Sequence, residues 1–136
     1  MPAPRATRFE PAAYAALRIV SGALFWFHGA QKILGWFAVK APPAFGSQLW
    51  VGGVIELIGG ALITLGLFTR CAAFVCSGTM AVAYTQFHWK LALGAGQWLP
   101  IVNKGELAVV YCFVFLYIWT QGPGVASLDS LRRSVK

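Results

Sequence analysis

The chain has 136 residues, of which 58% are hydrophobic and only 11% are charged, and its formal net charge is +7. A soluble globule of this length has a large surface that needs more polar residues, so the composition excludes an ordinary soluble domain and favours a membrane protein. The positive charge does not indicate nucleic-acid binding, because the basic residues stand singly or in pairs beside apolar segments and form no basic face.

Four apolar segments follow one another, each close to the ~20 residues that a helix needs to cross the hydrocarbon core of a bilayer. We expect them at residues 14–37, 49–68, 71–91 and 104–120. Connections with turn-forming residues separate them, at 41–46, at Thr69-Arg70 and at 94–100. Short connections place successive helices antiparallel. The sequence therefore predicts one all-α domain over residues 1–136, an integral membrane up-and-down four-helix bundle.

The basic residues set the expected orientation of this bundle, because cytoplasmic segments are enriched in Lys and Arg. Placing both termini and the 69–70 turn in the cytoplasm gathers most of the basic residues there: Arg5, Arg8, Arg18, Arg70, Arg132, Arg133 and Lys136. Arg18 and Arg70 are interpreted as topology anchors whose long side chains reach the cytoplasmic interface. Both termini are therefore predicted to be cytoplasmic.

Polar and ionisable side chains gather at one depth, near the outer ends of the predicted helices. They are His28, Gln31, Lys32, Glu56, His88, Lys104 and Glu106. Such groups are costly in a bilayer unless they find partners, so they should face the bundle interior or a cavity. Glu56 shares a helix face with Gly52, Gly59 and Gly60, where another helix can approach closely. We therefore expect Glu56 to be buried near Lys32, and the segment 27–37 to form one wall of an outer pocket.

Each of these residues also has a purely structural interpretation. Asn103 and Glu106 have the spacing of a capping box, so Glu106 could only cap the fourth helix. His88 could be a structural histidine, and Glu56 could form a buried ion pair with Lys32 that fixes the helix register. The gathering of all these groups at one depth is a stronger indication of function than any single member.

Several short motifs of the chain, in this order, resemble the DoxX family: residues 18–22, 28–32, 53–60, 66–70, 83–84 with His88, 103–107, and 122–124 with 127–129. The resemblance covers residues 17–129 and implies a four-helix protein of the bacterial inner membrane. Family members are associated with membrane redox systems, among them a thiosulfate:quinone oxidoreductase, and distant relatives help to assemble other membrane proteins. The polar positions that recur in the family correspond here to His28, Lys32, Glu56 and Glu106.

The first functional hypothesis is a membrane subunit of a redox system that binds a quinone or a small redox substrate in the polar cluster. His28 and Lys32 could donate hydrogen bonds to quinone carbonyls, and Glu56 with His28 could relay the proton, which makes these two the catalytic candidates. The candidates for binding substrate or cofactor are His28, Gln31, Lys32, Glu56, His88, Lys104 and Glu106. In a variant of this hypothesis, Lys32, Lys104 and a protonated histidine bind an oxyanion such as thiosulfate.

The sequence has no motif for a covalent cofactor and no spacing typical of a metal site. Haem b held by His28 and His88 is a much weaker alternative to quinone. A complete oxidoreductase would thus need a partner subunit, and whether the chain is itself an enzyme stays open.

The second hypothesis is a non-enzymatic assembly or scaffold subunit whose buried polar network is structural. Under either hypothesis we expect the lipid bilayer and a partner protein as partners, and no nucleic acid; a homo-oligomer stays open.

Overall fold

The computed structural model describes residues 8–94 and 96–134, and over these residues the protein is all-helical. Its elements are α1 (Glu10–Ile33), α2 (Gln48–Leu65), α3 (Thr69–Ala83), the π-helical turn η1 (Tyr84–Trp89), α4 (Pro100–Asn103), α5 (Glu106–Gln121) and α6 (Leu128–Ser134). The predicted segments coincide largely with α1, α2, α3 with η1, and α5, whereas the short helices α4 and α6 were not predicted. Of the residues that set the orientation, Arg5 and Lys136 lie outside the described part.

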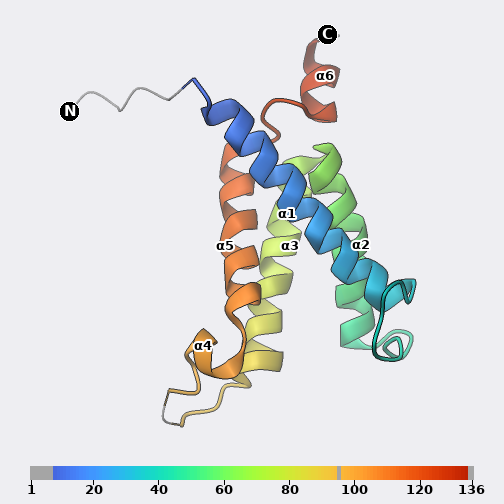
Figure 1. The fold of residues 1–136 in the computed structure, drawn as a ribbon, viewed down its shortest axis with the longest axis vertical. Coiled ribbons are helices and arrows are strands. Elements are labelled where there is room, and N and C mark those ends of the chain that lie inside the picture. Colours follow the sequence, from blue (N-terminus) through green and yellow to red (C-terminus); the bar gives the residue numbers. More distant parts are fainter. Residues whose placement is uncertain (1–7, 95, 135–136) are drawn as a thin grey trace, which may run out of the picture.

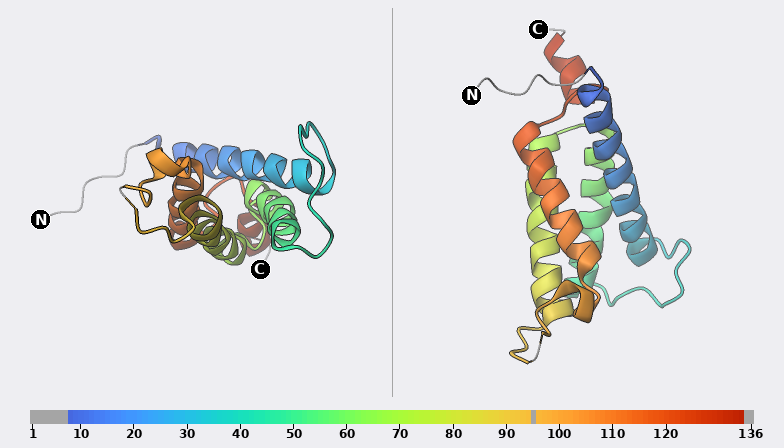
Figure 2. Two further views of the ribbon diagram at one scale, coloured as in Figure 1. Left: turned by 90° about the horizontal axis from the view of Figure 1, so that it is seen from below. Right: turned by 60° about the vertical axis from the view of Figure 1, so that its left-hand side comes forward.

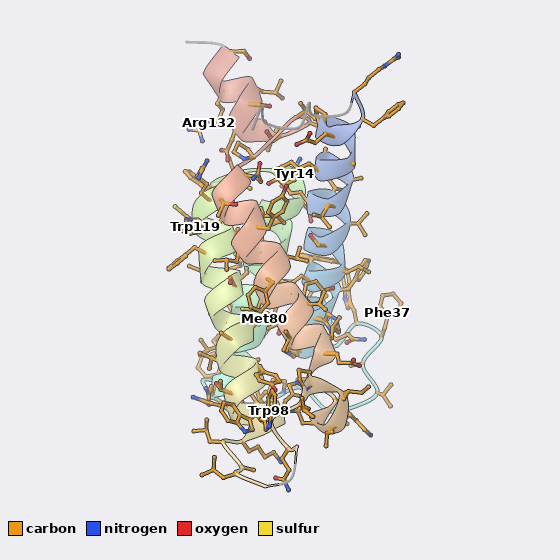
Figure 3. The ribbon with its side chains drawn as sticks, turned by 90° about the vertical axis from the view of Figure 1, so that its left-hand side faces the viewer. Tyr14, Phe37, Met80, Trp98, Trp119 and Arg132 are labelled. Carbon is orange, nitrogen blue, oxygen red and sulfur yellow. The ribbon has the colours of Figure 1, made fainter. Side chains whose placement is uncertain are left out.

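The four long helices lie side by side and alternate in direction (Figure 1). α1 packs along α2, α3 packs along α5, and α2 and α3 join these two pairs (Figure 2). The start of α1 and helix α6 lie at the same end of the molecule, and α4 lies at the opposite end. Tyr14, Trp119 and Arg132 lie toward the first end, and Trp98 toward the second (Figure 3).

Within the described residues, α2 alone is both long and apolar enough to cross a membrane by length and composition, with a mean hydropathy of 1.6. Helix α5 is apolar but has only 16 residues. Helix α1 is longer, with 24 residues, but it carries charged side chains at Glu10, Arg18 and Lys32. The crossing of the bilayer by all four helices therefore stays a prediction.

The ends of α1 and α2 are set by glycines in the left-handed conformation. α1 ends at Ile33, four residues before the predicted boundary, and Gly35 follows with a φ of +69°. α2 ends before Gly66, whose φ is +67°, and there the backbone N–H of Leu67 donates to the carbonyl of Leu62. Glycine adopts this conformation without the strain that a Cβ causes, which is why both helices stop where they do.

Helices α1 and α2 approach each other closely through glycines. A Cβ at Gly29 would lie 2.6 Å from the Cα of Leu57, and a Cβ at Gly60 would lie 2.7 Å from the Cα of Trp26. The buried residues of α2 are Gly53, Glu56, Gly59, Gly60 and Ile63. The prediction that a glycine-rich face of α2 is an interface containing Glu56 is thus confirmed, although Gly52 faces open space.

The interpretation of Arg18 as an anchor that reaches the interface is wrong. Its side chain is fully buried, and its guanidinium donates to the carbonyls of Ile63 at 2.7 Å, Thr64 at 2.8 Å and Ala126 at 2.7 Å. A cation is favourable at a helix C-terminus because the last carbonyls have no partner within the helix. Arg18 therefore joins α1, the end of α2 and the segment before α6. Arg70, by contrast, is exposed, as expected.

Asp129 in α6 caps the start of α3 from 60 residues away. Its carboxylate accepts hydrogen bonds from the backbone N–H of Phe68 at 3.1 Å and of Thr69 at 3.0 Å, and from the Thr69 hydroxyl at 2.9 Å. Phe68, the residue that precedes α3, offers no side-chain cap of its own. Helix α6 is therefore held against the α2–α3 turn.

We expect this contact to weaken in acid. Burial alone would raise the pKa of Asp129, but hydrogen bonds from Thr69 and Phe68 and the charge of Arg132 outweigh it and lower the pKa below the ordinary 3.8. A carboxylate with a lowered pKa in the folded state stabilises fully above its ordinary pKa, and this stability is lost as the pH falls through the folded-state pKa. Pepsin should therefore cleave near α6 only in the range below pH 3.8.

The Asp129→Asn variant serves as the comparison, since it removes the charge at every pH. Its α6 region should be cleaved by a neutral protease at a pH where the wild type resists. Equal resistance of the two proteins at neutral pH would contradict the capping role of Asp129.

Candidate functional site

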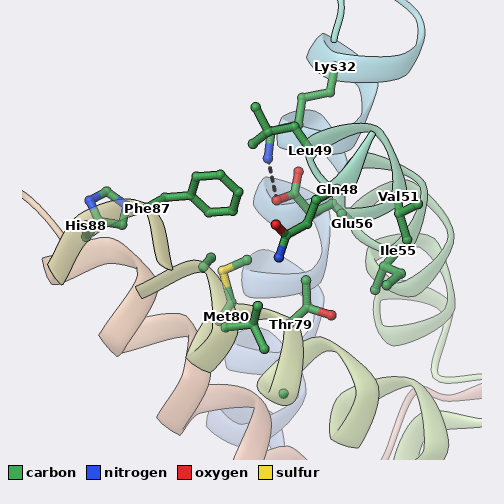
Figure 4. A pocket seen from close by; sticks show the side chains of 14 residues that line it. Lys32, Gln48, Leu49, Val51, Ile55, Glu56, Thr79, Met80, Phe87 and His88 are labelled. Carbon is green, nitrogen blue, oxygen red and sulfur yellow. Dashed lines mark hydrogen bonds and ion pairs between the residues drawn. The ribbon is translucent and has the colours of Figure 1, made fainter. Parts of the chain in front are cut away.

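A cavity of about 450 Å³ lies between α2 and α3, with Lys32 of α1 at its back (Figure 4). Its size falls within the ~300–1,000 Å³ of small-molecule sites. We call it the Glu56 pocket. Its lining is mostly apolar, with Leu49, Val51, Ile55, Met80, Val82 and Phe87, and its polar side chains are Lys32, Gln48, Glu56, Thr79 and His88.

The structure brings Lys32 and Glu56 together, as predicted. The Nζ atom of Lys32 donates to Oε1 of Glu56 at 2.6 Å, and this is an ion pair. The Glu56 side chain is 5% exposed, whereas that of Lys32 is 35% exposed. Gly53 makes this approach feasible, because a Cβ there would lie 2.9 Å from the Cβ of Lys32. The pair thus has one partner inside the protein and one at the edge of the cavity.

The second carboxylate oxygen of Glu56, Oε2, is buried and has no hydrogen-bond partner among the described residues. Nearly all buried polar atoms of folded proteins have partners, because an unsatisfied one costs about 1–3 kcal/mol. Oε2 belongs to a residue that lines the pocket. Oε2 has almost no accessible surface, so a donor in the pocket reaches it only when the Glu56 side chain turns toward the cavity, and such a hydrogen bond would remove this cost.

His88 lies at the rim of the pocket, in the π-helical turn η1 that continues α3. π-helical turns are rare and frequently occur at functional sites. The ring of Phe87 points into the cavity, and His88 lies on the far side of this ring from the Lys32–Glu56 pair (Figure 4). Nδ1 of His88 is 3.3 Å from the carbonyl oxygen of Asn103. His88 thus lies between the pocket and the 96–105 connection.

Four of the predicted site residues do not line the Glu56 pocket. His28 is half-buried beside Tyr111, with ring centroids 6.2 Å apart and planes nearly perpendicular. Gln31 is exposed and donates to the carbonyl of Phe37. Lys104 and Glu106 are exposed between α4 and the first turn of α5. The predicted wall made by residues 27–37 is therefore reduced to Lys32.

The capping box expected at the start of the fourth helix is not formed. α5 begins directly at Glu106 after Gly105, with no side-chain hydrogen bond to the cap. Asn103 instead ends α4, where its Oδ1 accepts from the N–H of Gly105 and its Nδ2 donates to the carbonyl of Gln97. The pattern was misleading because four residues form a helix of their own between Pro100 and Asn103.

One glutamine was missed as part of the site. Gln48, the first residue of α2, lines the pocket and donates to the side-chain oxygen of Gln86 in η1. This contact joins α2 and η1 across the mouth of the cavity. Spacing could have revealed Gln48, since it precedes Glu56 by eight residues and so lies on nearly the same face of the helix.

The arrangement suits an amphipathic ligand: an apolar cavity with one cation, one carboxylate and an amide directed to one region. Within the described part of the chain, no three His, Cys, Asp or Glu side chains are grouped as a metal site would require. His88 lines the pocket and His28 does not. Binding and proton exchange are what these side chains can provide.

Comparison with known protein sequences identifies the family of the chain. The chain is 41% identical over 128 residues to an uncharacterized protein of Haemophilus influenzae, an alignment that covers 90% of this chain and 92% of the relative. It is 26% identical over 119 residues to a Bacillus subtilis protein named "Putative oxidoreductase CatD", covering 83% and 81% of the two chains. No solved structure matches. The sequence model of the DoxX family matches residues 13–89, from α1 to the end of η1. The chain therefore belongs to the DoxX family.

Proposed function

We propose that this protein is the membrane subunit of a redox system in the bacterial inner membrane, and that the Glu56 pocket binds the headgroup of a quinone. The buried, unpartnered Oε2 atom of Glu56 carries the proposal. Membership of the DoxX family and the similarity to a protein named as an oxidoreductase support the redox assignment.

In this proposal the four long helices cross the bilayer, with both termini in the cytoplasm. The start of α1 and helix α6 share one end of the molecule, together with Arg132 (Figures 1 and 3). Arg70 lies in the first turn of α3, near Asp129 of α6 through the neighbouring Thr69. Basic residues at this end agree with a cytoplasmic location. The Glu56 pocket then lies in the outer half of the membrane.

The two forms of a quinone match different atoms of the site. A quinone carbonyl accepts hydrogen bonds, and the ammonium group of Lys32 can donate one. A quinol hydroxyl donates, and Oε2 of Glu56 can accept from it. Reduction adds two electrons and two protons, so that both carbonyls become hydroxyls. Glu56, held beside Lys32 at 2.6 Å, is positioned to pass one of these two protons to or from the oxygen next to it. The second proton, at the opposite oxygen of the ring, is exchanged with water.

The electrons must come from elsewhere, because the chain has no motif for a redox cofactor. We assign them to a partner subunit that oxidises a reduced sulfur oxyanion such as thiosulfate, the donor implied by the family resemblance. Since His28 does not line the pocket, the proton that a side chain exchanges with the headgroup is assigned to Glu56 alone.

The assignment is tested by mass spectrometry of the organic extract of protein purified in mild detergent. Wild type should carry quinone in near-stoichiometric amount, and Glu56→Gln should bind it at least about tenfold more weakly and lose most of it, because losing one charged hydrogen bond costs about 1.5–3 kcal/mol. Glu106→Gln is the matched control, since that carboxylate is exposed outside the pocket and its loss should not change the quinone content.

The same samples address the alternative of a non-enzymatic assembly or scaffold subunit. The glycine contacts of α1 and α2 and the Lys32–Glu56 pair would then serve only to fix the helix packing. Wild type and Glu56→Gln would both lack quinone and would capture the same partner proteins. This outcome would overturn the redox proposal.

A further inference from the structure

A second cavity lies next to the Glu56 pocket, between the same two helices. It is a groove of about 310 Å³ between α2 and α3, lined mainly by Val54, Ile55, Ile58, Leu62, Val75 and Cys76. We call it the Ile58 groove. Ile55 lines both the pocket and the groove, so the two spaces lie next to each other on either side of this side chain. The groove extends from there toward the end of α2, away from Gln48 at the pocket mouth.

The Ile58 groove is apolar and open to the outside of the molecule. Ile58 is 56% exposed and Val75 is 51% exposed, so both side chains form its rims. Its floor is closed where Gly59 packs directly against the sulfur of Cys76. From Glu56 to Leu62 the helix rises about 9 Å, enough to follow an extended hydrocarbon chain for several carbons. The groove is thus a furrow on the lipid-facing side and does not lead into the core.

We infer that the ligand of the Glu56 pocket carries a long isoprenoid chain and that this chain lies in the Ile58 groove. The inference rests on the proposed function, because it takes the polar head to be a quinone ring beside Glu56. A ring held there has its substituent directed either to the polar mouth at Gln48 or to the apolar groove beyond Ile55. Only the groove matches a hydrocarbon chain, since apolar surface gains free energy when it leaves water or a polar surrounding.

This assignment narrows the class of substrate. Each buried CH₂ contributes to affinity, so a long-chain quinone should bind more tightly than one with a single isoprene unit. A water-soluble benzoquinone or a small oxyanion would use none of the groove. The pocket therefore selects a quinone dissolved in the bilayer, which enters sideways between α2 and α3.

The test compares binding of two probes, a long-chain ubiquinone and ubiquinone with one isoprene unit, to wild type and to Val75→Trp in the same detergent. A tryptophan at position 75 fills the groove from α3, while its exposed position leaves the core unchanged. This substitution should weaken binding of the long-chain probe about tenfold, which corresponds to the loss of roughly two buried CH₂ groups. Binding of the short probe should not change. Ile58→Trp, which fills the groove from α2, should have the same effect.

Val110→Trp is the matched control, because Val110 of α5 is equally exposed at 56% and lies outside the groove. Each probe partitions into the detergent to the same extent for every variant. The ratio of the affinities of two variants for one probe is therefore independent of this partition. If Val75→Trp and Ile58→Trp bind both probes as wild type does, the isoprenoid chain of the quinone does not lie in the Ile58 groove. The proposed function then still stands. If wild type binds neither probe, the proposed function fails and this inference with it.

Discussion

Replacing Arg18 with methionine should lower the free energy of unfolding by about 3 kcal/mol, since each buried acceptor left without a donor costs about 1–3 kcal/mol. Methionine keeps much of the side-chain volume but cannot donate to the carbonyls of Ile63, Thr64 and Ala126. The end of α2 and the segment before α6 would lose their shared partner. Equilibrium unfolding by SDS in mixed micelles measures the difference.

Arg18→Lys separates charge from geometry. Lysine retains the cation, but a single ammonium group cannot reach the carbonyls of Ile63 and Thr64 and that of Ala126 together, as the planar guanidinium does. We expect Arg18→Lys to recover only a minor part of the loss. Arg70→Lys is the control, because Arg70 is exposed and donates to one carbonyl, that of Trp119. An Arg18→Met protein as stable as Arg70→Lys would show that the buried guanidinium is not what holds these segments.

Replacing Gly29 with alanine should destabilise the protein by a similar amount, about 3 kcal/mol, the upper range for overpacked sites. The added Cβ would lie 2.6 Å from the Cα of Leu57 and 2.8 Å from the carbonyl carbon of Glu56, so backbone would have to move. Separation of α1 from α2 would also pull Lys32 away from Glu56. The variant should therefore lose both stability and bound quinone, measured by the same unfolding and extraction experiments.

Gly52→Ala is the matched control for stability, because a Cβ at Gly52 meets nothing within 4 Å although the residue belongs to α2; it is no control for bound quinone, since Gly52 lines the Glu56 pocket. Alanine favours a helix over glycine by about 0.5–1 kcal/mol, so this variant should be neutral or slightly more stable. If both alanine variants had the same stability, the close approach of α1 and α2 at Gly29 would be disproved.

Both the helical fold class and the contact between Lys32 and Glu56 could be predicted from the sequence, because each follows from the pattern of apolar and polar residues along the helices. Apolar runs of sufficient length between turn residues indicate helices without any tertiary knowledge. A carboxylate on a glycine-rich helix face must be buried when that face packs, and it then needs a cation at the same depth. Lys32 was the nearest cation at that depth, and the structure has the two at 2.6 Å.

What the sequence could not reveal depends on contacts between distant segments. Arg18 beside apolar residues is typical of a side chain that reaches toward water, and only the position of the 125–126 segment shows that it is buried. The depth argument also placed Glu106 and Lys104 in the cluster, since equal depth was taken for proximity. Depth gives the position of a residue along the helix axis but not the direction in which its side chain faces. The rotation of α5 and the additional helix α4 place these two residues at the surface.

The cap that Asp129 provides for α3 also constrains how the protein is made. The chain leaves the ribosome from its N-terminus, so the α2–α3 turn is synthesised about 60 residues before its cap. Until residue 129 emerges, the N–H groups of Phe68 and Thr69 lack the carboxylate, and the guanidinium of Arg18 lacks Ala126. A nascent or prematurely terminated chain that stops after α5 thus keeps an unfinished turn at the end of α2. Residues 126–129 therefore complete, late in synthesis, backbone contacts that the earlier part of the chain leaves open.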